Sequence, residues 1–232
     1  MRKFALILIT LFYILNCLAQ ETVKRKNYLL PSVTEIYEVL KANDSVKQGL
    51  YQAFFKRKIV LASGAYVNNK KSGVWHFYDT DGKLIENYNY TNLNLQYEQR
   101  MDSATNRHIV YAFDAKYTDT DRLTRPVKPG GRCYGYIPFL QLFYLPENLD
   151  SINTTLYVGI VELVISPYGR LADIKIHIKS SFDEYITDYS PELVNEEDRE
   201  FIPATINRQP IISRIFVRCR LTYDGRLDLA AD

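Results

Sequence analysis

Apolar and polar residues alternate in the last third of the chain. From Tyr157 to Ile165 the odd-numbered residues are uncharged, whereas Glu162 falls among the even-numbered ones. From Ile174 to Ile178 isoleucines alternate with polar residues, and His177 falls on the polar side, where we expect it to be solvated. A period of two with one uncharged face is typical of a half-buried strand. The intervening Pro167–Arg170 predicts a turn, so the two strands form an antiparallel hairpin.

The final predicted strand, Ile211–Leu221, follows the same pattern. Its odd-numbered residues are apolar or small, and the opposite face carries Ile212, Arg214, Phe216, Arg218 and Arg220. Three arginines keep this second face in water, so the strand is half buried. Between the hairpin and this strand, Ser190-Pro191 is a typical helix start and predicts a short helix that ends at Arg199.

An internal repeat lies earlier in the chain. When the sequence is shifted by 24 positions, Gly49-Leu50-Tyr51 falls on Gly73-Val74-Trp75. The second copy reads as a strand at Val74–Tyr78, a turn at Asp79–Gly82 and a second strand at Lys83–Tyr90. The Asp-Gly pair is a strong hairpin signal, because glycine accepts the positive φ that such turns need. Each copy is therefore predicted to be one β-hairpin.

The first copy departs from the second at its turn, where Lys56-Arg57-Lys58 replaces the expected Asn-Gly or Asp-Gly. Two such hairpins cannot bury their apolar face alone. We expect them to pack on flanking strands or on the C-terminal part of the chain. Next, Ile109–Phe113 predicts one strand in a charged linker, and the proline and glycine residues of Arg125–Gly131 predict a domain boundary.

Together these patterns, with the high tyrosine and phenylalanine content, predict an α+β fold that is mostly β. We expect hairpin repeats followed by a small antiparallel sheet with one or two short helices. The predicted divisions are residues 1–19, 20–36, 37–97 for the repeats, 98–130 for the linker and 131–232 for the C-terminal domain.

The N-terminus reads as a secretory signal peptide. Arg2 and Lys3 precede an uncharged run of 16 residues, and Cys17-Leu18-Ala19 provides small residues before a cleavage site at Gln20. The run is shorter than the roughly 20 residues that span a bilayer. An uncleaved anchor and lipidation at Cys17 are the alternatives. The chain is therefore expected to be exported to the periplasm or cell envelope.

Cleavage would leave 27 basic and 27 acidic residues, so the exported chain would be formally neutral. A neutral chain lacks the positive surface that binds nucleic acid or anionic lipid, so we expect neither as a direct partner. Two cysteines, Cys133 and Cys219, would reach an oxidising compartment. They are expected either to form a disulfide or to be two buried free thiols.

Two family resemblances follow from these motifs. The run Gly73–Asp79, with Asp81-Gly82-Lys83, resembles MORN-type repeats, in particular those of the YwqK-like family. The last third resembles the C-terminal domain of TonB-type energy transducers, in which two strands, a helix, an aromatic-x-Pro-Ala tag and a last strand occur in this order. The matching segments here are Val158–Ile165, Gly169, Asp173–Ile178, residues 182–200, Phe201–Ala204 and Pro210–Leu221.

The second resemblance implies a protein-binding module of the envelope that captures an extended peptide. Physically, such capture is β-strand addition to an exposed sheet edge. We expect the edge to be the last strand, with Arg214, Phe216, Arg218 and Arg220 near the ligand; the arginines are alternatively only a solvated face. The expected partner is a TonB-dependent receptor or another envelope protein.

An alternative is an envelope structural or scaffold protein that binds through its hairpins at Trp75 and Tyr78, with no role in energy transduction. Catalysis has little support in the sequence. The histidines, His76, His108 and His177, show no metal-ligand spacing, and no nucleophile elbow, phosphate loop or dinucleotide motif occurs. We therefore expect no enzymatic activity, metal or cofactor.

Overall fold

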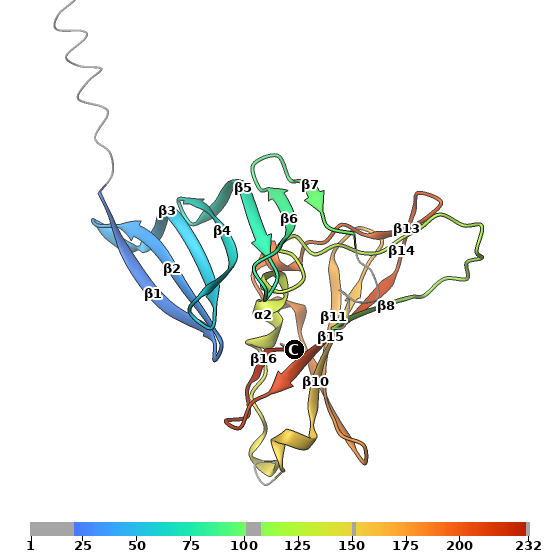
Figure 1. Cartoon of the computed structure of the whole chain (residues 1–232). Coiled ribbons are helices and arrows are strands. Elements are labelled where there is room, and N and C mark those ends of the chain that lie inside the picture. Colours follow the sequence, from blue (N-terminus) through green and yellow to red (C-terminus); the bar gives the residue numbers. More distant parts are fainter. Residues whose placement is uncertain (1–20, 101–107, 150–151, 231–232) are drawn as a thin grey trace, which may run out of the picture.

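The computed structural model describes residues 21–100, 108–149 and 152–230 (Figure 1). The predicted signal peptide, residues 1–19, lies outside these ranges. Strands dominate the described residues and all pair antiparallel, as predicted for a mostly β fold. The one α-helix in the described ranges is α2, Ile137–Leu140. No helix of these ranges is both long and apolar enough to cross a membrane.

The N-terminal half forms one seven-stranded sheet in which each strand pairs with the next along the chain. Its strands are β1 (Thr22–Leu30), β2 (Val33–Leu40), β3 (Asn43–Phe55), β4 (Ile59–Val67), β5 (Lys70–Tyr78), β6 (Leu84–Asn89) and β7 (Asn94–Glu98). The two predicted hairpins are present as β3–β4 and β5–β6. The sheet begins at Thr22 and not at Tyr37, because β1 and β2 flank the hairpins on one side.

The two repeat turns differ both in sequence and in backbone conformation. In the β5–β6 turn Gly82 has a φ of 83°, and the Asp79 carboxylate accepts hydrogen bonds from the backbone N–H groups of Asp81 and Lys83. In the β3–β4 turn Lys56 and Arg57 have φ values of 47° and 63°. The first copy therefore places two residues in the left-handed region without the glycine that makes this conformation easy, whereas the second places only Gly82 there.

The C-terminal half forms a six-stranded sheet in the order β12-β11-β10-β15-β16, and β8 also pairs with β15. Its strands are β8 (Ile109–Phe113), β10 (Val158–Ile165), β11 (Leu171–Lys179), β12 (Glu184–Tyr189), β15 (Ser213–Leu221) and β16 (Leu227–Leu229). The predicted β10–β11 hairpin and the strand at 109–113 are confirmed. The predicted alternation is confirmed as well: on β10 and β15 the odd-numbered residues are buried.

The predicted edge position of the last strand is wrong. One side of β15 pairs with β10 over Ser213–Arg220, and the other side pairs with β8 over Ser213–Val217 and with β16 over Cys219–Leu221. The edge is covered by β8, which lies about 100 residues earlier, and by β16 just after the strand, and the strand's own pattern encodes neither pairing.

The single helix predicted between the hairpin and the last strand is also wrong. Residues 182–200 contain β12 and two short 3-10 helices, η4 (Pro191–Leu193) and η5 (Glu196–Arg199). The Ser190 side chain does cap the first of them, accepting a hydrogen bond from the Glu192 backbone N–H. A third, three-stranded sheet joins β9 (Leu123–Thr124), β13 (Ala204–Ile206) and β14 (Gln209–Ile211).

One hydrophobic core unites the two large sheets, with α2 between them (Figure 1). The segment that leads into α2 is aromatic: the ring of Tyr134 stacks on Phe77 at 5.7 Å, and its hydroxyl donates a hydrogen bond to the Tyr51 hydroxyl at 2.8 Å. On the other side Phe139 is fully buried and contacts Phe201. The hairpins therefore lean on flanking strands and on the C-terminal half, as expected.

The segment Arg125–Gly131, predicted as the domain boundary, is largely buried between the sheets. The backbone N–H groups of Gly130 and Gly131 donate to Glu86 Oε1 at 2.7 and 3.2 Å, and Glu86 is 2% exposed. Burial raises the pKa of Glu86 to about 7, although both N–H donors oppose this. Burial likewise lowers the pKa of Lys128 to about 8. The connection is thus part of the core: it carries the buried Lys128 and binds the buried Glu86 of β6.

Cys133 and Cys219 are free thiols, so the disulfide alternative is wrong and the alternative of two free thiols holds. Cys133 lies beside the β5–β6 turn, where burial raises the pKa of its thiol to about 12. Cys219 packs against Gly159 in the other sheet, and burial raises the pKa of its thiol as well. The two thiols belong to different parts of the core.

Replacing Glu86 by glutamine tests the buried carboxyl. The folded-state pKa lies above the unfolded value, so folding takes up a proton and stability falls as pH rises from about 4.5 to 7. Full ionisation of Glu86 lowers the free energy of unfolding by about 3 kcal/mol. In Glu86→Gln the amide oxygen still accepts from the two glycines, so this pH-dependent loss disappears. Urea unfolding of wild type and Glu86→Gln at pH 5 and pH 8 measures this loss. An equal pH dependence of stability in the two proteins would contradict the assignment of the loss to Glu86.

The free thiols give a second prediction, for the protein purified without reductant. Thermal unfolding should occur at the same temperature with and without added reductant, and unfolding should expose both thiols to a thiol reagent. A disulfide closing this loop would contribute roughly 4 kcal/mol. Its reduction would lower the midpoint by about 8–16 °C, a shift that would refute the free-thiol assignment.

Candidate functional site

The outer face of the C-terminal sheet carries a charged network centred on Glu162 of β10. The Arg214 guanidinium donates to Glu162 Oε1 at 2.7 Å and, on its other side, to both carboxylate oxygens of Asp114 at 3.2 and 3.4 Å. These hydrogen bonds raise the pKa of Arg214. Because Glu162 is 8% exposed, Arg214 neutralises a buried carboxylate and is not a free contact for a ligand.

His177 belongs to the same network, so its predicted exposure to solvent is wrong. Its Nε2 lies 3.0 Å from Glu162 Oε2 and its Nδ1 lies 3.0 Å from Glu184 Oε1. The side chain is 15% exposed. The hydrogen bond from His177 lowers the pKa of Glu184. His177 was placed among solvated lysines because β-strand parity shows which face a residue lies on but not its cross-strand neighbours.

The remaining predicted contact residues are not brought together into one site. Arg220 donates to Asp228 at 2.9 Å, and Phe216 is half buried on the outer face opposite Glu162. Arg218 is exposed and makes no ion pair with the described residues. In the other sheet Trp75 is fully buried, its indole N–H donating to the Ala65 carbonyl.

Of the two aromatic residues predicted as hairpin contacts, only Tyr78 keeps some surface in contact with solvent. The prediction that Trp75 meets a partner is therefore wrong, because its ring is part of the aromatic core between the sheets.

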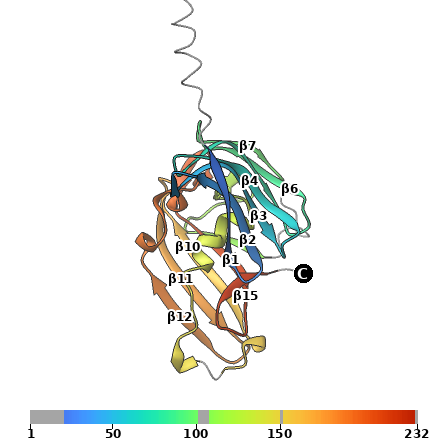
Figure 2. The same cartoon turned by 90° about the vertical axis from the view of Figure 1, so that its left-hand side faces the viewer.

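Strand β12 is the edge strand on one side of the C-terminal sheet, and the short strands β8 and β16 share the other side. Strand β12 pairs with β11 over Glu184–Tyr189, and no other described strand pairs with it. Figure 2 shows β12 as the outermost strand, followed by β11 and β10. Ile186 on this strand is 54% exposed. Residues 184–189 show period-two alternation, with two tyrosines and a threonine on the inner side, a strand signal that the helix prediction overlooked.

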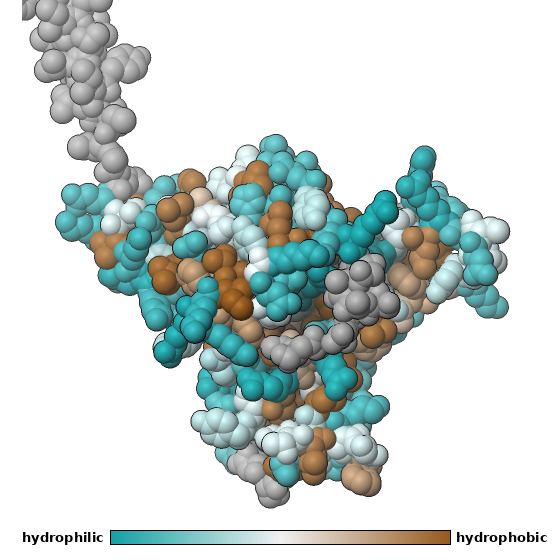
Figure 3. All heavy atoms as spheres, in the orientation of Figure 1, coloured by the Kyte–Doolittle hydropathy of each residue, from teal (hydrophilic) through white to brown (hydrophobic). Residues whose placement is uncertain are grey.

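The surface seen in Figure 3 offers hydrophobic residues in separate groups among hydrophilic ones. Several large side chains of the described residues stand almost fully in solvent at loop tips: Tyr168, Phe182 and Tyr223 are at least 92% exposed. A sheet edge supplies backbone donors and acceptors for recognition, whereas such scattered apolar tips do not form one continuous face.

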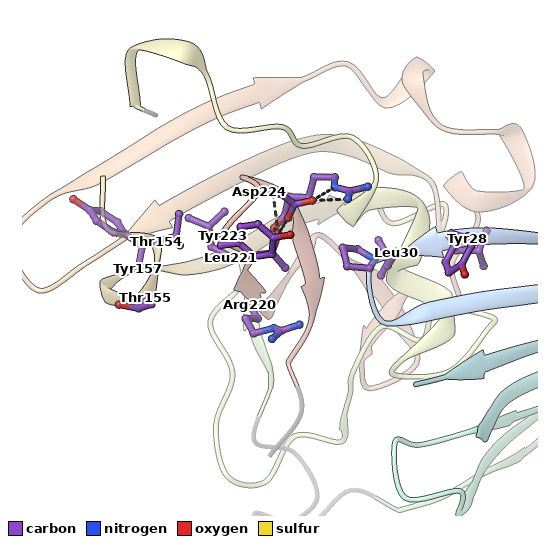
Figure 4. Close-up of a pocket in the computed structure, with 13 residues that line it drawn as sticks. Tyr28, Leu30, Thr154, Thr155, Tyr157, Arg220, Leu221, Tyr223 and Asp224 are labelled. Carbon is purple, nitrogen blue, oxygen red and sulfur yellow. Dashed lines mark hydrogen bonds and ion pairs between the residues drawn. The ribbon is translucent and has the colours of Figure 1, made fainter. Parts of the chain in front are cut away.

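A cleft of about 900 Å³ opens where the two large sheets diverge (Figure 4). One wall is the β1–β2 corner with Tyr28 and Leu30. The other wall comes from the β15–β16 turn, where Tyr223 stands in solvent and Thr222 and Arg226 both bond Asp224. The short 3-10 helix η3 (Thr154–Leu156) forms the third wall of the cleft.

Each wall of the cleft is shaped by a turn. At the β15–β16 turn Gly225 has a φ of 77°, and a side chain there would collide with Leu145 at 2.7 Å. At η3 the Asn153 side chain accepts hydrogen bonds from the Thr155 N–H and hydroxyl. The cleft is therefore lined by tyrosine rings, threonine hydroxyls and guanidinium groups, and hydrogen bonds and close packing hold the turns that carry them. Nothing in the sequence pattern pointed to it, because its walls come from three distant segments.

Within the described parts of the chain, no three histidine, cysteine, aspartate or glutamate side chains are arranged to hold a metal ion. Comparisons with protein-family models, with curated proteins and with solved structures found no match to this chain. The residues themselves therefore carry the functional argument.

The Arg214 contacts give a matched pair of variants. Arg214→Met leaves the buried Glu162 carboxylate with His177 as its one remaining partner, so we expect a loss of about 1–2 kcal/mol in the free energy of unfolding. Arg218→Met removes an exposed charge without an ion pair and should change stability by less than about 0.5 kcal/mol. Urea unfolding compares them. Equal effects would mean that both arginines are merely solvated.

Proposed function

We propose that this chain is an exported, non-enzymatic protein-binding module of the cell envelope. It captures an extended segment of a partner by β-strand addition at the free edge of β12. The signal-like N-terminal sequence supports the compartment. The unpaired edge of β12, a six-residue strand that pairs with β11 alone, is the single observation that carries the mode of binding.

The direction of the backbone groups on β12 follows from its hairpin with β11. The Ser180 N–H donates to the Asp183 carbonyl, so this pair is hydrogen-bonded. Hydrogen-bonded and non-hydrogen-bonded pairs alternate along an antiparallel ladder. The register is unbroken from Lys179↔Glu184 to Ile174↔Tyr189. The N–H and C=O groups of Ile186, and of its neighbours Glu184 and Asp188, therefore point outward and are available to a ligand strand.

The outer side chains of β12 supply the selectivity. Ile186 offers an apolar contact, while Glu184 is held by His177 and Lys179, and Asp188 by Lys175. These charges are already balanced within the sheet, so the backbone and Ile186 provide most of the recognition. A segment with an apolar residue opposite Ile186 fits this edge best.

The resemblance to TonB C-terminal domains favours a TonB-dependent receptor or another envelope protein as the partner. The capture site moves from the last strand to β12, because β8 and β16 cover the edge that the resemblance suggested. A scaffold that binds through the MORN-like hairpins is less favoured, since Trp75 is buried and cannot touch a partner.

Proline at position 186 tests the proposal. Ile186→Pro removes one outward N–H and keeps the ladder with β11, because proline is tolerated on edge strands. Ile186→Val keeps both the N–H and an apolar β-branched side chain. We expect crosslinking in intact cells, followed by mass spectrometry, to recover an envelope partner with wild type and Ile186→Val but not with Ile186→Pro.

Thermal unfolding of the purified variants serves as the control, and all three proteins should remain folded. Recovery of the same partner by folded Ile186→Pro would rule out strand addition at β12. Loss of the partner in the Arg214→Met variant alone would return the binding site to the arginine face.

A further inference from the structure

A second, basic pocket adjoins the cleft. Its volume is about 360 Å³, and its polar lining consists of Ser32, Thr34, Lys56, Arg57, Arg220 and Asp228. The pocket and the cleft share Pro31 and Arg220. Together they form one groove, which runs from the β3–β4 turn past Arg220 to the β15–β16 turn and η3.

Arg220 is held in place at the centre of this groove. Its Nη2 donates to Asp228 Oδ2 at 2.9 Å, and the Ser32 hydroxyl donates to the other oxygen of the same carboxylate at 2.5 Å. Asp228 is fully buried, whereas the Arg220 side chain is 62% exposed. The buried carboxylate thus orients a guanidinium whose remaining donors face the groove.

The charges that line the groove do not balance. Asp228 is matched by Arg220, and Asp224 is matched by Arg226. Lys56 and Arg57 have no carboxylate partner among the described residues; Arg57 instead donates to the Tyr28 hydroxyl at 3.1 Å. The groove is therefore positive by two charges at its β3–β4 end.

These two unbalanced cations occupy a turn that disfavours them. Both have positive φ values, whereas Thr80 and Asp81, on which they fall after the shift of 24 positions, do not. A non-glycine residue in the left-handed region costs about 1–2 kcal/mol. Residues held at such a cost cluster at functional sites. The placement of both side chains on the basic pocket supplies a reason for the departure from the repeat.

We propose that this groove binds an acidic peptide segment, with carboxylates on Lys56, Arg57 and Arg220 and aromatic or apolar side chains against Tyr28 and Tyr223. Charge complementarity selects the anionic ligand. The elongated shape, with tyrosine rings and threonine hydroxyls beyond the cations, fits a chain better than a single small anion. This surface is separate from β12 and does not rest on the function proposed above.

The turn itself provides the test. Lys56→Asn/Arg57→Gly restores the Asn-Gly sequence that the left-handed turn prefers, so the variant should gain about 2–4 °C in its unfolding midpoint. The same variant removes both unbalanced cations and should weaken binding by about tenfold or more. The probe is a fluorescein-labelled peptide of alternating glutamate and tyrosine, measured by fluorescence polarisation with the full-length chain.

A matched control has the same net charge as the Lys56→Asn/Arg57→Gly variant. Lys58→Gln/Lys83→Gln also removes two positive charges from exposed hairpin turns, but neither residue lines the groove. We expect this control to bind the probe as wild type does, and wild-type binding to weaken as salt increases.

Three outcomes would overturn the proposal. The first is unchanged binding by Lys56→Asn/Arg57→Gly. The second is an equal loss in the control, which would show an effect of net charge alone. The third is groove-dependent binding of inorganic phosphate or polygalacturonate without binding of the peptide, which would assign the groove to another kind of anion. Since the double variant is expected to be more stable than wild type, misfolding cannot imitate the predicted result.

Discussion

The need of two one-sided sheets to bury their apolar faces determines most of this structure. A hairpin sheet with one apolar face is not stable alone in water. Here both large sheets close on the segment that contains α2, and the aromatic contacts of Tyr134 and Phe139 join them into one core. Two surfaces stay open outside this core: the outer edge of β12, and the groove where the sheets diverge.

The junction between the sheets also carries buried charge, which is costly without compensation. Glu86 receives two backbone N–H groups from the glycines of the connecting segment, and Lys128 lies 5.0 Å above the Phe201 ring. Through these contacts, β6 and the Phe201–Ala204 segment both pack on the Arg125–Gly131 connection. A segment whose composition suggested a boundary between domains thus fixes the position of one sheet against the other.

The sequence predicted the structure best where buried and exposed residues alternate regularly along a strand. Alternation along β10, β11 and β15 predicted the buried faces, and the Asp-Gly signal predicted the β5–β6 hairpin, because both are local properties of the chain. Strand order was not predictable in this way. The pairing of β8 with β15 joins segments about 100 residues apart in sequence, and the contacts of His177 depend on strands on either side of it. For the same reason the edge strand and the groove were missed.

The two hairpin copies show how a departure from a repeat acquires meaning only in three dimensions. In sequence, Lys56-Arg57 is simply a poor turn. In the fold, both residues adopt left-handed conformations at the expense of strain, and their side chains lie beside Arg220, a residue of the other sheet. A solvent-exposed turn without a role has no reason to retain two such residues, because Asn-Gly would satisfy the same geometry at lower cost. The strain and the excess positive charge therefore coincide at a groove between the two sheets.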